Sequence, residues 1–538
     1  MAGPRRAAAP GEWHRRLAAG ERRRRLGGAG RAGFADGAVC AVLVAQWADR
    51  AGPVRERASQ AGRSVSAGAR SGATGLRGGY SASVRREVAR PCLLASGAAR
   101  RLVRQRAAEA GRAEPAAAPG HSRSPVPVLV PPAGPELTSN QTLARLPGPV
   151  QPVPRQGDPG LNDTTPVLVD AVRTPFGKRD GWVSDLHAVQ LLSRVQRGVL
   201  DRAGLEPGEV DQVIGGCVTP LGEQYGHVVR SAWLYGGLPA ATGATTIDAQ
   251  CSTSMQASFL LTGQIANGTV DAGVACGVEL MSRVPLTPKQ GTGAGTPRPA
   301  DWSLETPDQY TAADRIARKR GLSRADLDAF GLRSQHNARK AWDAGLFDRQ
   351  VLPLEVPDGR RITRDQGLRE TSTEALAGLR TTVPDGLHTA GTSSQVSDGA
   401  SAALFLSRGR AGELGLRPRA RLLAQCVIGG DLEYLLDGPV AAARKLLDRT
   451  GLTIGDIDLF EVNEAFAAVP LSFAQVHGVP EDKLNVLGGA IALGHPAGAT
   501  GIRLLATAVE ELERRDASLA MIAICAAAAT SCVLVERI

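Results

Sequence analysis

The 538-residue sequence predicts an α/β protein whose mostly parallel sheet is covered by helices on both faces. Two observations lead to this fold class. From residue 165 onward, short apolar runs typical of buried strands alternate with segments of helical periodicity. The second part of that region then repeats the order of strands and helices of the first, which indicates an internal duplication. No apolar run approaches the ~20 residues that a membrane helix needs, so we expect no membrane partner.

Residues 1–160 differ from the rest of the chain in composition. They carry 26 Arg, no Lys and 10 acidic residues, whereas the remainder has a net charge of −6. The overall charge of +10 thus arises from this extension, and we expect no nucleic-acid partner. Arg, Ala, Gly and Pro dominate the segment, which predicts a disordered extension and linker. Its start faintly resembles a mitochondrial transit peptide but is much longer.

The eight cysteines do not form a metal or disulfide framework. None lies in a CxxC pair, and no Cys/His cluster has the spacing of a zinc site. We therefore expect reduced thiols, no metal and a cytoplasmic protein.

The first half of the ordered region predicts strands that alternate with helices. Gly204 and Gly268 follow two of the helices, where glycine commonly ends them. The expected strands are 166–172, 210–217, 245–249, 271–277 and 396–406, and the expected helices are 186–203, 226–236 and 253–267.

An insertion of different character and a second half complete the prediction. Residues 285–384 are rich in Gly, Pro, Thr and charge, which indicates a lid-like region with helices at 310–320 and 324–344. The second half predicts strands at 418–427, 457–462, 519–525 and 532–537, and helices at 440–448, 465–477 and 500–514.

Cys251 is the first candidate for chemistry, in the stretch T-T-I-D-A-Q-C-S-T-S-M-Q-A at 245–257. The pattern predicts a strand, a tight turn, the cysteine and then a helix. A helix start favours a thiolate, so we expect the pKa of Cys251 to lie below the ~8.5 of a free thiol. The alternative is a small buried side chain without chemistry.

Three later segments are further candidates. Asn463, in N-E-A-F-A at 463–467, follows a strand and could simply cap the next helix. His495 lies in the glycine-dense loop G-G-A-I-A-L-G-H-P-A-G-A-T-G at 488–501, where the backbone can approach a ligand closely. Cys525 ends a strand and could be a core thiol. A nucleophilic cysteine, a histidine and a second thiol fit acyl transfer through a thioester.

From Thr165 to Ile538 the sequence resembles the thiolase family, the acetyl-CoA acyltransferases. Five motifs in order carry the resemblance: V-D-A-V-R-T-P-F-G-K at the first strand, D-A-Q-C-S-T-S-M-Q-A around Cys251, A-C-G-V-E-L-M-S at 275–282, and the two motifs around Asn463 and His495. The family implies a duplicated αβαβα layered fold with an inserted loop domain. Its parts would be an N-terminal half at 161–284 and 385–408, a CoA-binding loop domain at 285–384 and a C-terminal half at 409–538.

The resemblance also implies roles for the candidate residues. Cys251 would be the nucleophile, His495 its activating base and Cys525 the acid/base for the α-carbon of acetyl-CoA. Asn463 would hold a water that forms an oxyanion hole with His495. The N–H of Ala527, with that of Cys251, would form a second oxyanion hole. Two further residues would contact CoA: Ser394 at the pantetheine arm, and Arg369 near the nucleotide.

The resemblance implies an enzyme that cleaves 3-ketoacyl-CoA with CoA to acetyl-CoA or propionyl-CoA and a shortened acyl-CoA, or the reverse condensation. Acyl-CoA and CoA would be substrates, with no bound cofactor, in a homodimer or homotetramer. The run Q-Y-T-A-A-D-R-I-A at 309–317 resembles thiolases of lipid or steroid side-chain breakdown.

One departure from the family pattern supports an alternative. Alanines follow Cys525 where the family has a glycine run, which would be strained if the backbone there needed a positive φ. The alternative function is a catalytically weak thiolase-like protein that binds acyl-CoA. A ketosynthase on the same fold is disfavoured, because those enzymes lack the second catalytic cysteine.

Overall fold

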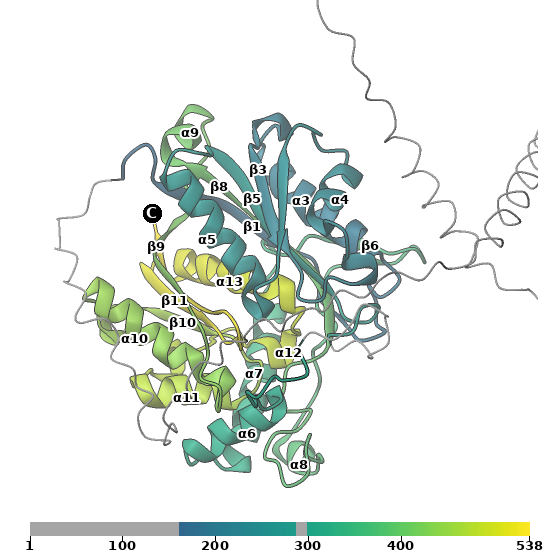
Figure 1. Ribbon diagram of the computed structural model, residues 1–538, viewed down its shortest axis with the longest axis vertical. Coiled ribbons are helices and arrows are strands. Elements are labelled where there is room, and N and C mark those ends of the chain that lie inside the picture. The colour runs from purple at the N-terminus through teal and green to yellow at the C-terminus, as the bar shows by residue number, and fades with distance from the viewer. Residues whose placement is uncertain (1–160, 287–297) are drawn as a thin grey trace, which may run out of the picture. The chain divides into compact units, whose positions relative to one another are not determined.

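A computed structural model of the chain describes residues 161–286 and 298–538 (Figure 1). The predicted disordered extension, residues 1–160, lies outside this part of the chain.

The first half contains the strands and helices that the sequence predicts, with small shifts at their ends. Its helix α3 ends at Gly204, which has the left-handed conformation (φ 69°) that glycine adopts readily. The elements are β1 (Pro166–Arg173), β2 (Gly177–Lys178), α3 (Ala188–Ala203), β3 (Gln212–Gly216), α4 (Val228–Tyr235), β4 (Gly243–Ile247), α5 (Thr253–Ala266), β5 (Ala272–Leu280) and β8 (Ser397–Ser407).

The second half follows the same order. Its elements are α9 (Arg408–Glu413), β9 (Ala420–Ile428), α10 (Gly438–Thr450), β10 (Leu459–Val462), α11 (Ala468–His477), α12 (Ala490–Leu493), α13 (Thr500–Arg515), β11 (Leu519–Ile524) and β12 (Thr530–Arg537). Between β5 and β8 the described chain forms α6 (Gln309–Lys319), α7 (Arg324–Asp343), β6 (Leu354–Glu355), β7 (Arg361–Ile362) and α8 (Thr373–Ala377).

The strand pairing shows the duplication directly. The first half has the order β4-β3-β5-β8-β1, and the second has β10-β11-β12-β9 with Leu484 bridging parallel to Phe460 where β4 would lie. In the first half β3 pairs parallel with β4 and β5, whereas β8 pairs antiparallel with β5 and β1. In the second half β10 pairs parallel with β11, whereas β12 pairs antiparallel with β11 and β9. The prediction of a mostly parallel sheet is therefore wrong. In the first half β8, which arrives after the insertion, runs antiparallel between β5 and β1.

Five layers result from this arrangement. Helices α3 and α4 pack on the first group of strands, and α10 and α11 pack on the second. Helices α5 and α13 lie between the two groups and share one core with both (Figure 1). Strands β5 and β8 are buried along their whole length, as expected of strands covered on both faces. The predicted duplicated αβαβα fold is confirmed.

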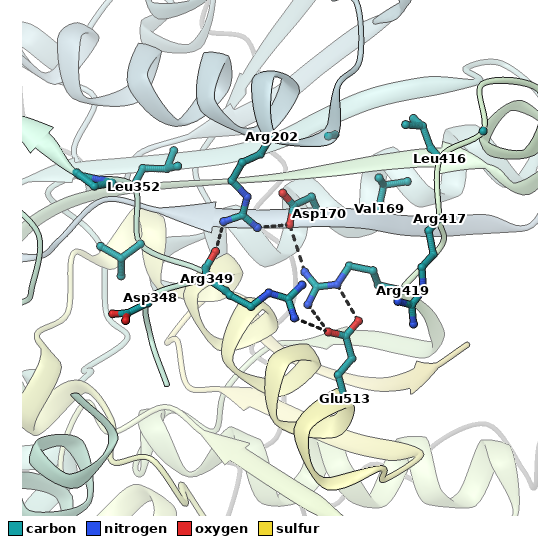
Figure 2. A pocket seen from close by; sticks show the side chains of 14 residues that line it. Val169, Asp170, Arg202, Asp348, Arg349, Leu352, Leu416, Arg417, Arg419 and Glu513 are labelled. Atoms are coloured by element: carbon teal, nitrogen blue, oxygen red, sulfur yellow. Dashed lines mark hydrogen bonds and ion pairs between the residues drawn. The ribbon is translucent and has the colours of Figure 1, made fainter. Parts of the chain in front are cut away.

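A cavity of about 640 Å³ lies beside the boundary of the two halves (Figure 2). Arg419, just before β9, reaches Asp170 of β1 at 3.2 Å and Glu513 of α13 at 2.7 Å. Arg202 at the end of α3 also pairs with Asp170, at 2.6 Å. This cavity contains none of the predicted site residues, and its ion pairs connect the halves.

Candidate active site

Cys251 and His495 meet although they are far apart in the sequence. The Sγ atom of Cys251 lies 3.3 Å from Nε2 of His495. Cys251 belongs to a 3₁₀ turn, Gln250–Ser252, which follows β4 and leads into α5. His495 precedes α13, and α5 and α13 pack against each other in the central layer. The contact thus arises because the starts of two adjacent helices, one from each half, face the same site.

A hydroxyl group fixes the tautomer of His495. Thr500 Oγ1 lies 2.7 Å from Nδ1 of His495, and the same hydroxyl donates to Pro496 O at 2.9 Å. Thr500 therefore accepts the Nδ1–H, which leaves Nε2 as the unprotonated nitrogen that faces Cys251. Burial lowers the pKa of His495 to about 3, with the positive charge of Arg503 as a smaller cause. A neutral imidazole in this orientation can accept the thiol proton.

The expected low pKa of Cys251 is wrong for this structure. Burial raises it to about 12, and the charges of Glu279 and Asp248 act in the same direction. The thiol therefore faces a neutral imidazole as a neutral group. A proton transfer to His495 during attack, rather than a standing thiolate, fits this electrostatic setting.

Asn463 points toward the same histidine. Its Nδ2 lies 3.5 Å from Nε2 of His495, and its Oδ1 has no hydrogen-bond partner among the described residues. The alternative that Asn463 caps a helix is wrong, because α11 begins only at Ala468 and has no side-chain cap. The buried Oδ1 is thus free to accept a hydrogen bond from a small polar group beside His495.

Cys525 lies at the end of β11 and is fully buried. Burial is the main cause that raises its pKa, the charge of Cys251 adds to it, and a hydrogen bond with Asn463 lowers it in part. Cys525 therefore lies in the same site as Cys251 and Asn463.

The alanine run after Cys525 is not strained. None of residues 526–529 is among the described residues with positive φ. The methyl groups therefore do not impose the backbone cost that the sequence suggested. The N–H group of Ala527 donates to no backbone acceptor within 161–286 and 298–538, so it remains available.

Of the two predicted CoA contacts, Ser394 lies beside one of these loops. Ser394 N donates to Ala465 O at 2.9 Å, which places Ser394 against the Asn463 loop. Arg369 is exposed, and its guanidinium donates to Ala390 O at 3.1 Å.

Glu279 of β5 is a site residue that the sequence reasoning missed. This buried carboxylate accepts hydrogen bonds from Val218 N, Gln224 Nε2 and Gly498 N at 2.8–3.0 Å. Burial raises its pKa to about 7, while these donors oppose the rise. Glu279 lies in the motif at 275–282, and Thr500 lies in the loop at 488–501. Both residues therefore belong to motifs visible in the sequence, but the sequence predicted no role for either.

Neither a metal site nor a membrane helix is found in the described part of the chain. No group of three or more His, Cys, Asp or Glu side chains in it could hold a metal ion. Among those residues, no helix is both long and apolar enough to span a bilayer.

Comparisons with known proteins give one consistent result. Residues 166–409 match the family model for the thiolase N-terminal domain, and residues 416–537 match that for the thiolase C-terminal domain. The chain is 39% identical to a steroid 3-ketoacyl-CoA thiolase of Mycobacterium tuberculosis, over 70% of this chain and 95% of the relative. It is 36% identical to a 3-ketoacyl-CoA thiolase of Bacillus subtilis, over 67% and 95%. A solved structure, the acetyl-CoA acetyltransferase of Bacillus anthracis, matches with a TM-score of 0.64 and 32% identity, over 70% of this chain and 99% of that one.

Proposed function

The chain belongs to the thiolase family and is an acyltransferase whose substrates are acyl-CoA and CoA, and we propose that Cys251 carries the acyl group between them. It cleaves a 3-ketoacyl-CoA with CoA, the thiolytic step of β-oxidation. The observation that supports our assignment most strongly is the 3.3 Å contact between Cys251 and a histidine whose other nitrogen is held by Thr500.

We propose that the first half of the reaction runs as follows. His495 Nε2 takes the thiol proton while Sγ of Cys251 attacks the keto carbon C3. The C2–C3 bond then breaks, and its electron pair forms the enolate of acetyl-CoA. Cys525 gives its proton to C2, which releases acetyl-CoA and leaves an acyl group on Cys251 and a thiolate on Cys525.

The second half regenerates both cysteines. The Cys525 thiolate takes the proton of an incoming CoA thiol, whose sulfur attacks the acyl carbon. The acyl–sulfur bond to Cys251 breaks, and His495 returns its proton to the departing thiolate. Asn463 through a water, together with His495, would stabilise the enolate oxygen, and the N–H groups of Cys251 and Ala527 would stabilise the tetrahedral oxyanions.

We propose a fatty-acyl or steroid side-chain substrate, with residues 307–312 as part of the acyl-pocket wall. Tyr310 packs edge-on against Phe466 with ring centroids 5.4 Å apart, and Phe466 belongs to the Asn463 loop. This contact brings the segment that resembles thiolases of lipid or steroid side-chain breakdown close to the Asn463 loop. The name of the Mycobacterium tuberculosis relative agrees with a bulky substrate.

The remaining assignments are proposals from the family and the sequence. They are the halves at 161–284 with 385–408 and at 409–538, the CoA-binding loop domain at 285–384 with Arg369 and Ser394 as its contacts, a homodimer or homotetramer, no metal or bound cofactor and a cytoplasmic location. The alternative of a weak acyl-CoA-binding protein is not favoured by the comparisons.

A thiolysis assay with 3-ketoacyl-CoAs of several chain lengths, including a steroid side-chain CoA ester, tests the function. We expect CoA-dependent loss of the magnesium-enolate absorbance with at least one substrate, and none with Cys251→Ala. Correctly folded protein that cleaves none of them would contradict the proposed function.

A further inference from the structure

Gln250, the residue directly before Cys251, has an unusual backbone conformation. Its φ is 52°, in the left-handed region that favours glycine. Two hydrogen bonds hold it there: Gln250 N donates to Asp248 Oδ1 at 2.8 Å, and Gln250 O accepts from Thr253 Oγ1 at 2.7 Å. Glycine would adopt this conformation without strain. A long amide side chain at this strained position therefore indicates that the side chain has a function.

The side chain of Gln250 crosses from the first half of the protein to the second. Its Oε1 accepts a hydrogen bond from Ala528 N at 3.0 Å, and Ala528 is exposed on the loop after Cys525. On the other side of the same peptide unit, Ala527 O accepts from Gly430 N at 3.2 Å. Both polar groups of the peptide between Ala527 and Ala528 are therefore held, one of them by Gln250.

Fixing that peptide limits the rotation of the adjoining Ala527 N–H. We propose that Gln250 is a positioning residue, whose carboxamide holds the 527–528 peptide so that the N–H of Ala527 stays opposite the N–H of Cys251. Gln250 is bonded to Cys251 through the main chain and to Ala528 through its side chain, so one residue sets the separation of both N–H groups. This inference rests on the proposed function, because it assigns those groups to the second oxyanion hole.

The main variant is Gln250→Met, which keeps the length of the side chain but removes its oxygen acceptor. Removing one oxyanion donor from an enzyme costs about 10²–10³ in kcat, and displacing a donor should cost less. We expect kcat for thiolysis to fall about tenfold or more while KM stays within twofold. Alkylation of Cys251 by iodoacetamide, which needs no oxyanion hole, should stay within twofold of wild type.

Three further variants separate positioning from general damage. Gln250→Gly relieves the backbone strain, so it should fold as well as wild type and still lose kcat. Gln250→Glu keeps an acceptor oxygen and should retain wild-type deuterium uptake in a peptide covering 525–530, whereas Gln250→Met should increase that uptake. Gln475→Met on α11 is the matched control, because it removes a carboxamide hydrogen bond to Arg320 O at the end of α6 and should leave kcat unchanged.

The outcomes decide the proposal either way. A folded Gln250→Met or Gln250→Gly with kcat within twofold of wild type, or unchanged deuterium uptake in Gln250→Met, overturns it. Wild-type protein without thiolysis activity overturns the proposed function and the oxyanion role together. The deuterium uptake then still decides whether Gln250 holds the loop.

Discussion

The corner that carries Cys251 and the corner that carries His495 occupy equivalent places in the two halves but are built differently. In the first half, only residues 248–250 separate β4 from Cys251. In the second half, the bridge at Leu484 is followed by the longer segment 485–494, which contains the short helix α12, before His495. The nucleophile thus comes from a tight turn, and its base comes from a longer loop that needs support from elsewhere.

Two buried carboxylates provide that support. Glu279 of the first half accepts from Gly498 N at 3.0 Å, and Glu464 of the second half accepts from Ile491 N at 3.1 Å. His495 lies between these two points along the chain. Because each carboxylate is itself held by further donors, the long loop is restrained on both sides of the histidine. Equal topology in the two halves therefore does not determine which chemical group each corner carries.

The largest expected effect tests whether the two corners act as one unit. Cys251→Ala and His495→Ala should each lower kcat/KM for thiolysis about 10⁴-fold or more, and the double variant should fall little further, as for residues that share a step. Steady-state assays give the rates, and intact-mass measurement reports the acyl-enzyme. An acyl group that still forms on Cys251→Ala would remove this residue from its role, and additive losses would show that the corners act separately.

The next effect concerns the protonation of the pair. With a pKa of about 12 at Cys251 and about 3 at His495, both groups are neutral near pH 7. The thiolate fraction then rises tenfold per pH unit, so the alkylation rate of Cys251 should increase roughly hundredfold from pH 6.5 to 8.5. Iodoacetamide labelling followed by mass spectrometry measures this, with Cys251→Ala as background. A rate that reaches a plateau below pH 8 would instead indicate a standing thiolate–imidazolium pair.

A smaller effect should follow from the tautomer. Thr500→Val removes the acceptor for the Nδ1–H of His495 and leaves that N–H buried without its partner. The proton can then move to Nε2, which blocks acceptance from Cys251, and we expect kcat to fall on the order of tenfold to a hundredfold. Thr500→Ser keeps the hydroxyl and should stay within about threefold. Equal losses in both variants would point to packing instead of the tautomer.

The sequence predicted local features well, and it failed where distant segments decide the outcome. The periodicity from 253 to 267 located α5, and the motifs marked Cys251, Asn463, His495 and Cys525. Pairing direction was missed because periodicity does not show which strands become neighbours, and β8 and β12 each lie antiparallel between two strands of their half. The pKa of Cys251 was misjudged for the same reason, since burial and the charge of Glu279 follow from tertiary packing.

The smallest expected effect concerns the alanine loop of the second half. Because Ala527 lies outside the positive-φ region, its methyl group fits the backbone, and Ala527→Gly should change kcat by less than twofold. Glycine has more freedom in the unfolded chain, so the free energy of unfolding should fall by about 0.5–1 kcal/mol. Thiolysis assays and a urea midpoint measure the two effects, with Ala528→Gly as the neighbouring control. A more than tenfold gain in kcat would mean that the methyl group of Ala527 obstructs the oxyanion site opposite the tight corner that carries Cys251.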